Sequence, residues 1–203
     1  MRRRSLVLAA PAVLLAGCIT LLPKETPSQL YRFGGDLTPV QRPAVAASFG
    51  VEPLSISFAA PSAGDLILTT TGHEVAYIKG ARWVNGASVL FEQALANAFD
   101  ADAGPARLMA RGEVVRPDYF LKLDVRTFEA RYLQGQAAPP TVVVEIYAAL
   151  SAPGGRQIAG DHIFTASVAA QENRGGAIAA AYDQATGQVL QQIVKWVDAK
   201  GAG

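Results

Sequence analysis

Three long runs of alternating apolar and polar residues, between residues 119 and 169, constrain the fold of this chain more than any other feature. Apolar side chains at every second position are typical of β-strands with one buried face. Pro153-Gly154-Gly155 provides a turn between the second run and the third. Strands that follow one another through turns pair as an antiparallel meander, so we expect these three to form the centre of an antiparallel sheet.

The first run contains a change of phase. It separates two sets of apolar residues, which are Leu121, Leu123 and Val125, and then Phe128, Ala130 and Tyr132. In a regular strand these sets would lie on opposite faces, whereas one extra residue in a β-bulge returns them to the same face. We therefore predict a bulge near Arg126–Phe128, with Leu121, Leu123, Val125, Phe128 and Tyr132 all facing the core.

Two stretches have the spacing of apolar residues that is typical of an amphipathic helix. The first follows Asn85, a residue type common at N-caps, and ends before Gly104-Pro105. The second begins after Gly176 and runs nearly to the C-terminus. Each helix has one apolar stripe, with Leu95 in the first and Ile193 in the second. These elements predict an α+β fold, a two-layer sandwich with a mostly antiparallel sheet and both helices packed on one face.

The N-terminus has the pattern of a secretory signal peptide. Arginines occupy positions 2–4, an apolar run too short to span a bilayer covers 6–15, and small residues precede Cys18. Leu-Ala-Gly-Cys resembles the lipobox of bacterial lipoproteins. The resemblance implies removal of residues 1–17, a diacylglycerol on the Cys18 thiol and acylation of the new amino group. Two or three acyl chains give the durable anchoring that a single chain does not. The arginines leave both general and twin-arginine export open.

Cys18 is the only cysteine of the chain, so an internal disulfide is excluded. A plain secretory signal is the alternative, but it would leave an unpaired thiol in an oxidising compartment. Residues 18–29 are expected to be the lipidated cysteine and its tether, followed by one domain at 30–200. Loss of the arginine-rich signal leaves nearly balanced charge, which gives no basis for binding nucleic acid.

The chain lacks the signatures of catalysis. His73 and His162 are far apart in sequence, and His162 shares the apolar parity of a strand, which favours a half-buried structural role. No nucleophile elbow, zinc-protease motif or phosphate-binding loop occurs. We therefore expect no enzymatic activity, no metal and no other cofactor.

Candidate interaction residues fall in two places. Trp83 lies between a strand and the first helix, where both a hot spot and a core position are open. The second candidate is the sheet face opposite the helices, with Lys122, Asp124, Arg126, Glu145 and Tyr147. Its mixed charges favour a polar protein–protein contact over a lipid-lined surface, for example between copies of this chain in a ring around a partner.

The order of features along the chain resembles a known family. The features are Tyr31, Ser55-Ile56-Ser57-Phe58, Asp65-Leu66-Ile67, Val75-Ala76-Tyr77, Trp83, the helical stretch 89–99, the strand 119–125 and the long final helix. This order is similar to that of the ABC-type transport auxiliary lipoproteins, which include the paraquat-inducible protein C type, over residues 30–198.

The resemblance implies a role in lipid transport across the envelope. Such lipoproteins accompany Mce-domain proteins and an ABC permease with its ATPase, which move lipids between the two membranes. Ile19 stands where an aspartate would favour the inner membrane, so anchoring at the periplasmic face of the outer membrane is implied. Two alternatives stay open: direct binding of a small or lipidic ligand in an apolar pocket, and a structural role in the envelope. The sequence leaves the cargo, the partner surface and any homo-oligomer undetermined.

Overall fold

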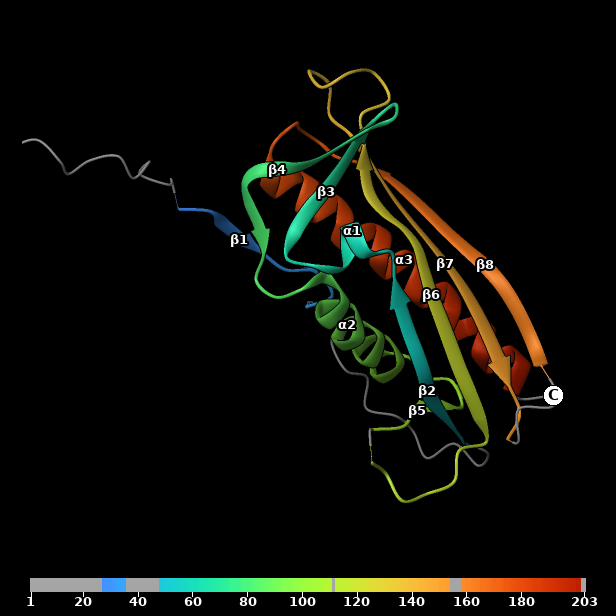
Figure 1. Cartoon of the computed structure of the whole chain (residues 1–203). Helices are drawn as coiled ribbons and strands as arrows, with labels where there is room; N and C mark the ends of the chain where they lie inside the picture. Colours follow the sequence, from blue (N-terminus) through green and yellow to red (C-terminus); the bar gives the residue numbers. More distant parts are fainter. Residues whose placement is uncertain (1–26, 36–47, 111, 154–157, 202–203) are drawn as a thin grey trace, which may run out of the picture.

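The structure, a computed structural model, describes residues 27–35, 48–110, 112–153 and 158–201. An eight-stranded mixed sheet forms one layer, and the two long helices cover one of its faces (Figure 1). The elements are β1 (Gln29–Tyr31), β2 (Phe49–Phe58), α1 (Ala60–Ala63), β3 (Leu66–Thr71), β4 (Glu74–Trp83), α2 (Ala87–Ala101), β5 (Ala106–Leu108), β6 (Tyr119–Arg131), β7 (Thr141–Ser151), β8 (Ile158–Ala169) and α3 (Gly175–Gly201). The predicted α+β sandwich is confirmed.

The long strand β6 organises the sheet. β7 pairs antiparallel with one edge of β6 along its length. Two parallel strands share the other edge: β2 pairs with the first half of β6, and β3 pairs with its end, where Thr69 faces Ala130. β5 extends the sheet beyond β2, whereas β4 and β1 extend it beyond β3. The longest ladders, β6·β7 and β7·β8, are antiparallel.

The meander of β6, β7 and β8 lies at one side of the sheet and not at its centre. β6 and β7 each have neighbours on both edges, but β8 pairs only with β7 within the described residues. The prediction that all three strands would be central was therefore wrong for β8. Alternating apolar and polar residues indicate which face of a strand is buried, but they do not indicate how many neighbouring strands it pairs with.

The predicted bulge is present in β6. The register with β7 shifts between Val125 and Thr127, which makes Arg126 the extra residue. Val125 and Phe128 are consequently both buried, with exposed fractions of 0% and 2%. Tyr132 follows the end of the strand and is half-buried, and its hydroxyl donates a hydrogen bond to Asn173 Oδ1 over 2.8 Å.

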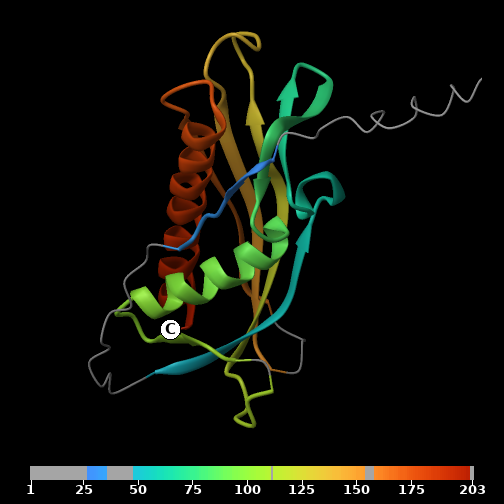
Figure 2. The same ribbon diagram turned by 90° about the vertical axis from the view of Figure 1, so that its left-hand side faces the viewer.

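Helices α2 and α3 lie on the same side of the strands (Figure 2). The apolar stripes of both helices pack into one hydrophobic core, where Leu95 is 1% and Ile193 is 0% exposed. α2 begins at Ala87 with Gly86 as N-cap, so the prediction of Asn85 was wrong by one position. A side-chain cap is not needed there, because the Ala87 N–H donates to the Gly64 carbonyl over 2.9 Å.

Trp83 belongs to the same core. Its side chain is 2% exposed, and the rings of Phe33 and Tyr182 meet it edge to face at centroid distances of 5.1 and 5.2 Å. The proposal of Trp83 as a surface interaction residue is therefore wrong. The segment after β1 places Phe33 against the indole, and sequence spacing gives no sign of that packing.

Candidate functional site

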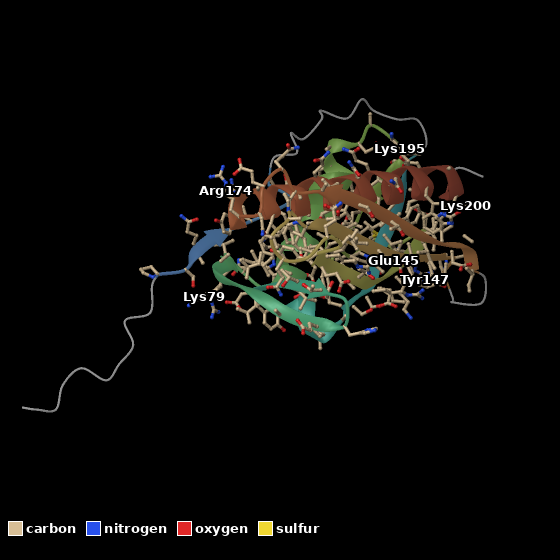
Figure 3. The ribbon with its side chains drawn as sticks, turned by 90° about the horizontal axis from the view of Figure 1, so that it is seen from above. Lys79, Glu145, Tyr147, Arg174, Lys195 and Lys200 are labelled. Carbon is tan, nitrogen blue, oxygen red and sulfur yellow. The ribbon has the colours of Figure 1, made fainter. Side chains whose placement is uncertain are left out.

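The face of the sheet that α2 and α3 leave uncovered is the candidate functional surface. Figure 3 shows Glu145 and Tyr147 on the side of the sheet away from α3, which carries Lys195 and Lys200. We call this surface the open face and define it by the outward residues of β6, β7 and β8: Lys122, Asp124, Arg126, Glu145, Tyr147 and Ile163. The sequence predicted that the first five of these would share one face, and the pairing of β6 with β7 brings them together.

Arg126 is the centre of the open face. Its guanidinium carbon lies 4.7 Å from the centroid of the Tyr147 ring, within the range of a cation–π contact. Its Nε lies 3.2 Å from Asp124 Oδ2, and Asp124 faces Tyr147 across the β6–β7 pair. Asp124 Oδ1 also accepts a hydrogen bond from Ser57 Oγ of β2 over 3.0 Å. The guanidinium is thus held in one place while it stays exposed to a partner.

The energetic value of this cluster to the free protein is small. The side chains of Arg126 and Asp124 are 43% and 38% exposed, and exposed ion pairs typically stabilise a fold by only about 0–1 kcal/mol. Lys122 is exposed beside the cluster, and Glu145 is partly exposed. The arrangement therefore positions charges of both signs without being needed for folding.

Apolar side chains interrupt the charges of the open face. Val143 is only 9% exposed although it points away from the helices, and Ile163 of β8 is 46% exposed. Ile163 faces Tyr147 across the β7–β8 pair. Arginine, tyrosine and apolar side chains are typical of the centre of a protein–protein interface, and charged side chains around them are typical of its polar rim.

Sequence reasoning missed a second charged group at the end of the open face. Arg131 Nε donates to Glu129 Oε1 over 2.6 Å, and the two side chains border a cavity of about 350 Å³. The sequence could have indicated this group, because after the change of phase in β6 both residues alternate with buried ones and therefore lie on the outward face. Burial raises the pKa of the neighbouring Tyr132 phenol, which favours the neutral form that donates to Asn173 Oδ1.

The lining of the cavities does not favour a lipid-binding pocket. The 350 Å³ cavity is bordered mainly by polar side chains and by Gly72. A cavity of about 260 Å³ beside α3 is bordered by two apolar side chains, Ala94 and Leu190, together with Asp183, three glutamines, Thr186 and two glycines. Ligand pockets for apolar molecules are lined predominantly by hydrophobic and aromatic side chains.

The other predicted site residues lie elsewhere. Cys18 is outside the described residues, so its lipidation stays a prediction. His162 is exposed at the edge strand with its ring 4.7 Å from that of Phe164, so the expectation of a half-buried histidine was wrong. Within the described ranges, no group of three or more His, Cys, Asp and Glu side chains lies together as a metal site would require. No helix in this part of the chain is long and apolar enough to cross a membrane.

Comparison with known proteins shows which family the domain with this surface resembles. The family of ABC-type transport auxiliary lipoprotein components matches the sequence over residues 36–194. The chain belongs to this family. The match covers α2, most of α3 and every strand except β1, so the open face is part of the family domain.

Solved structures share the fold of this auxiliary lipoprotein. Protein XCC0632 from Xanthomonas campestris, of family DUF330, is 26% identical with a TM-score of 0.72, and the match covers 86% of this chain and 97% of that one. An uncharacterized protein is 15% identical with a TM-score of 0.64, covering 85% and 99%. The hypothetical protein CT253 from Chlamydia trachomatis is 8% identical with a TM-score of 0.54, covering 76% and 98%, and shows the fold alone. No curated protein matches the sequence significantly.

Proposed function

We propose that this chain is a lipoprotein of the periplasmic face of the outer membrane, and that it serves an Mce/ABC-type system for lipid transport between membranes as a non-enzymatic auxiliary component. The observation that carries the proposal is the family match over residues 36–194. The lipobox ending at Cys18 supports the anchor, and Ile19 after it supports the outer membrane.

The chain would act as a docking subunit and leave translocation to its partners. Its sequence has no nucleotide-binding motif, so the energy would come from the ATPase of the ABC permease. Hydrophobic and aromatic side chains are a minority among the residues that border these two cavities, which supports a role other than carrying lipid. The Mce-domain protein is the partner we expect to contact the domain directly.

The open face is the surface that we expect to make this contact. Arginine and tyrosine are enriched among the residues that dominate binding energy, and Arg126 and Tyr147 already hold each other at 4.7 Å. A side chain fixed before binding loses less conformational entropy on association. The balanced charges around the pair would select a partner with a complementary pattern.

Charge reversal tests the proposal. We expect the full-length variants Arg126→Glu and Glu145→Arg to lose capture of the Mce-domain protein in a pull-down from membranes analysed by mass spectrometry. Their melting temperatures should change by no more than about 2 °C, because these side chains are not buried. Lys79→Glu is the matched control, since Figure 3 places Lys79 far from Glu145 and Tyr147. Failure of the unmodified protein to capture an Mce-domain protein would contradict the function, whereas unchanged capture by both reversals would exclude only the open face.

A further inference from the structure

The edges of the sheet differ in how well they are protected against pairing with another chain. β1 and β5 have three residues each, which is too short for a stable new ladder. β4 extends beyond its pairing with β1, but this stretch carries Glu74 and Lys79 and bends at Gly80, whose φ is +73°. Short strands, charges and bends are the usual protections of a sheet edge.

β8 has almost none of these protections. It has 12 residues without lysine, arginine or proline, and Asp161 is its only acidic residue. Its register with β7 is regular from Gly160 to Ala169. Among the described residues its other edge pairs with no strand, and Figure 1 shows it at the border of the sheet. Free backbone N–H and C=O groups along such a strand are a template for a further strand.

Apolar and aromatic side chains flank this edge on both faces of the sheet. On the open face, Ile163 is 46% exposed beside Tyr147. On the helix face, the half-buried Trp196 of α3 lies 5.7 Å from Phe164, centroid to centroid, and His162 is exposed. The backbone requires an extended strand as occupant, and these side chains favour one that brings apolar groups to both faces.

We propose that β8 pairs antiparallel with β8 of a second copy, about a twofold axis at Ile163. The axis would be perpendicular to the sheet, so that residues of equal parity face each other. Ile163 then meets Ile163, and Asp161 meets Thr165, so the carboxylate of the strand does not oppose another carboxylate. A twofold contact of this kind is self-complementary, so the edge needs no other chain. The two sheets become continuous and the two open faces join into one surface, a consequence that does not depend on the transport role.

Engineered cysteines test the pairing in the full-length protein. The twofold axis brings the two Cβ atoms of an Ile163→Cys variant to about 4.5–5.5 Å, close enough for a disulfide after a small adjustment. We expect most of this variant to run as a dimer on a non-reducing gel and as a monomer after reduction. The unmodified protein controls for Cys18, and Val75→Cys is the matched control, because Val75 is 61% exposed on the β4 edge. Equal dimerisation of both cysteine variants would indicate random collision and overturn the proposal, as would cross-linking of Ile163→Cys to other proteins alone.

Sedimentation in detergent provides a measurement that does not depend on the exact register. The full-length protein should sediment with twice the mass of one chain, and Ile163→Lys should sediment with the mass of one chain. Lysine is the side chain that natural edges use against pairing, and position 163 is exposed, so the far-ultraviolet circular dichroism should be unchanged. A monomeric unmodified protein, or a dimer that Ile163→Lys leaves intact, would refute the β8 contact.

Discussion

Gly34 shows at the scale of one residue how the N-terminal segment is fixed to the domain. Its N–H donates to Asp183 Oδ1 of α3 over 2.6 Å, and its carbonyl accepts from Asn97 Nδ2 of α2 over 2.8 Å. Its φ of +71° lies in the left-handed region, and a Cβ here would collide with Ala94. Only glycine tolerates both the left-handed backbone and the lack of space for a Cβ. The two hydrogen bonds of this residue join the segment after β1 to both helices.

Gly34→Ala should therefore lower the free energy of unfolding by about 2–4 kcal/mol, the sum of overpacking and backbone strain. Gly72→Ala is the matched control, because Gly72 also has a positive φ, +59°, but has open space around it. The control should lose only about 1–2 kcal/mol. Urea unfolding measures both, and equal losses would show that the contact with Ala94 is unimportant.

Tyr182 couples the stability of the core to pH. Complete burial raises the pKa of its phenol well above the usual 10.0, and the charge of Glu129 raises it further. The hydroxyl donates to the Leu68 carbonyl over 2.7 Å. Because the folded pKa is the higher one, the stabilisation is complete below the unfolded pKa of about 10 and is lost as the pH rises above it.

Tyr182→Phe should reduce the free energy of unfolding by about 1–3 kcal/mol at neutral pH, since the Leu68 carbonyl loses its partner. It should also reduce the loss of stability between about pH 9 and pH 11, because the tyrosine that ionises on unfolding is gone. Urea unfolding of both proteins at these pH values gives the comparison. Parallel pH profiles for the two proteins would show that another group controls the alkaline transition.

At the scale of elements, alternation and helical spacing predicted the parts of the fold that depend on the face an element buries. The bulge at Arg126 followed from parity alone, and so did the shared face of Lys122 and Glu145. The contact of Arg126 with Tyr147 could not be predicted, because it depends on how far the bulge turns the strand. The parallel pairing of β2 and β3 with one edge of β6 was missed as well, since parity does not record which strands are neighbours.

The two helix stripes provide the element-scale prediction. Leu95→Ala and Ile193→Ala each remove a fully buried side chain from the layer between helix and sheet, where exposure is 1% and 0%. Each should cost about 2–5 kcal/mol in the free energy of unfolding, from lost burial and the cavity left behind. Val89→Ala on α2 is the control, because Val89 is 47% exposed and should cost far less. A loss below 1 kcal/mol for Leu95→Ala in urea unfolding would contradict the packing described for α2.

At the scale of the whole molecule, the predicted anchor sets where the open face can act. Eight residues separate Cys18 from Pro27, the first described residue. An extended chain spans at most about 3.6 Å per residue, so the start of the domain would lie within roughly 30 Å of the membrane. The anchor would therefore hold the domain close to one membrane and leave its other surfaces to a partner that reaches across the periplasm.

Substitutions at the lipobox test this placement. In cells given labelled palmitate, the unmodified protein should carry label and fractionate with membranes, whereas Cys18→Ala should carry none and stay uncleaved or soluble in the periplasm. Thr20→Ala, which leaves the thiol in place, should behave as the unmodified protein does. Absence of label on the unmodified protein would refute the lipid anchor and leave the plain secretory signal as the explanation of residues 1–17.

Ile19→Asp separates anchoring from sorting. The cysteine is intact in this variant, so it should carry as much labelled palmitate as the unmodified protein. On a sucrose gradient of separated membranes it should move from the outer to the inner membrane fraction, because the resemblance to bacterial lipoproteins implies that an aspartate after the lipidated cysteine favours retention there. Ile19→Leu, with a side chain of similar size and no charge, should stay with the outer membrane. If the unmodified protein already fractionates with the inner membrane, the outer-membrane part of the proposal is wrong.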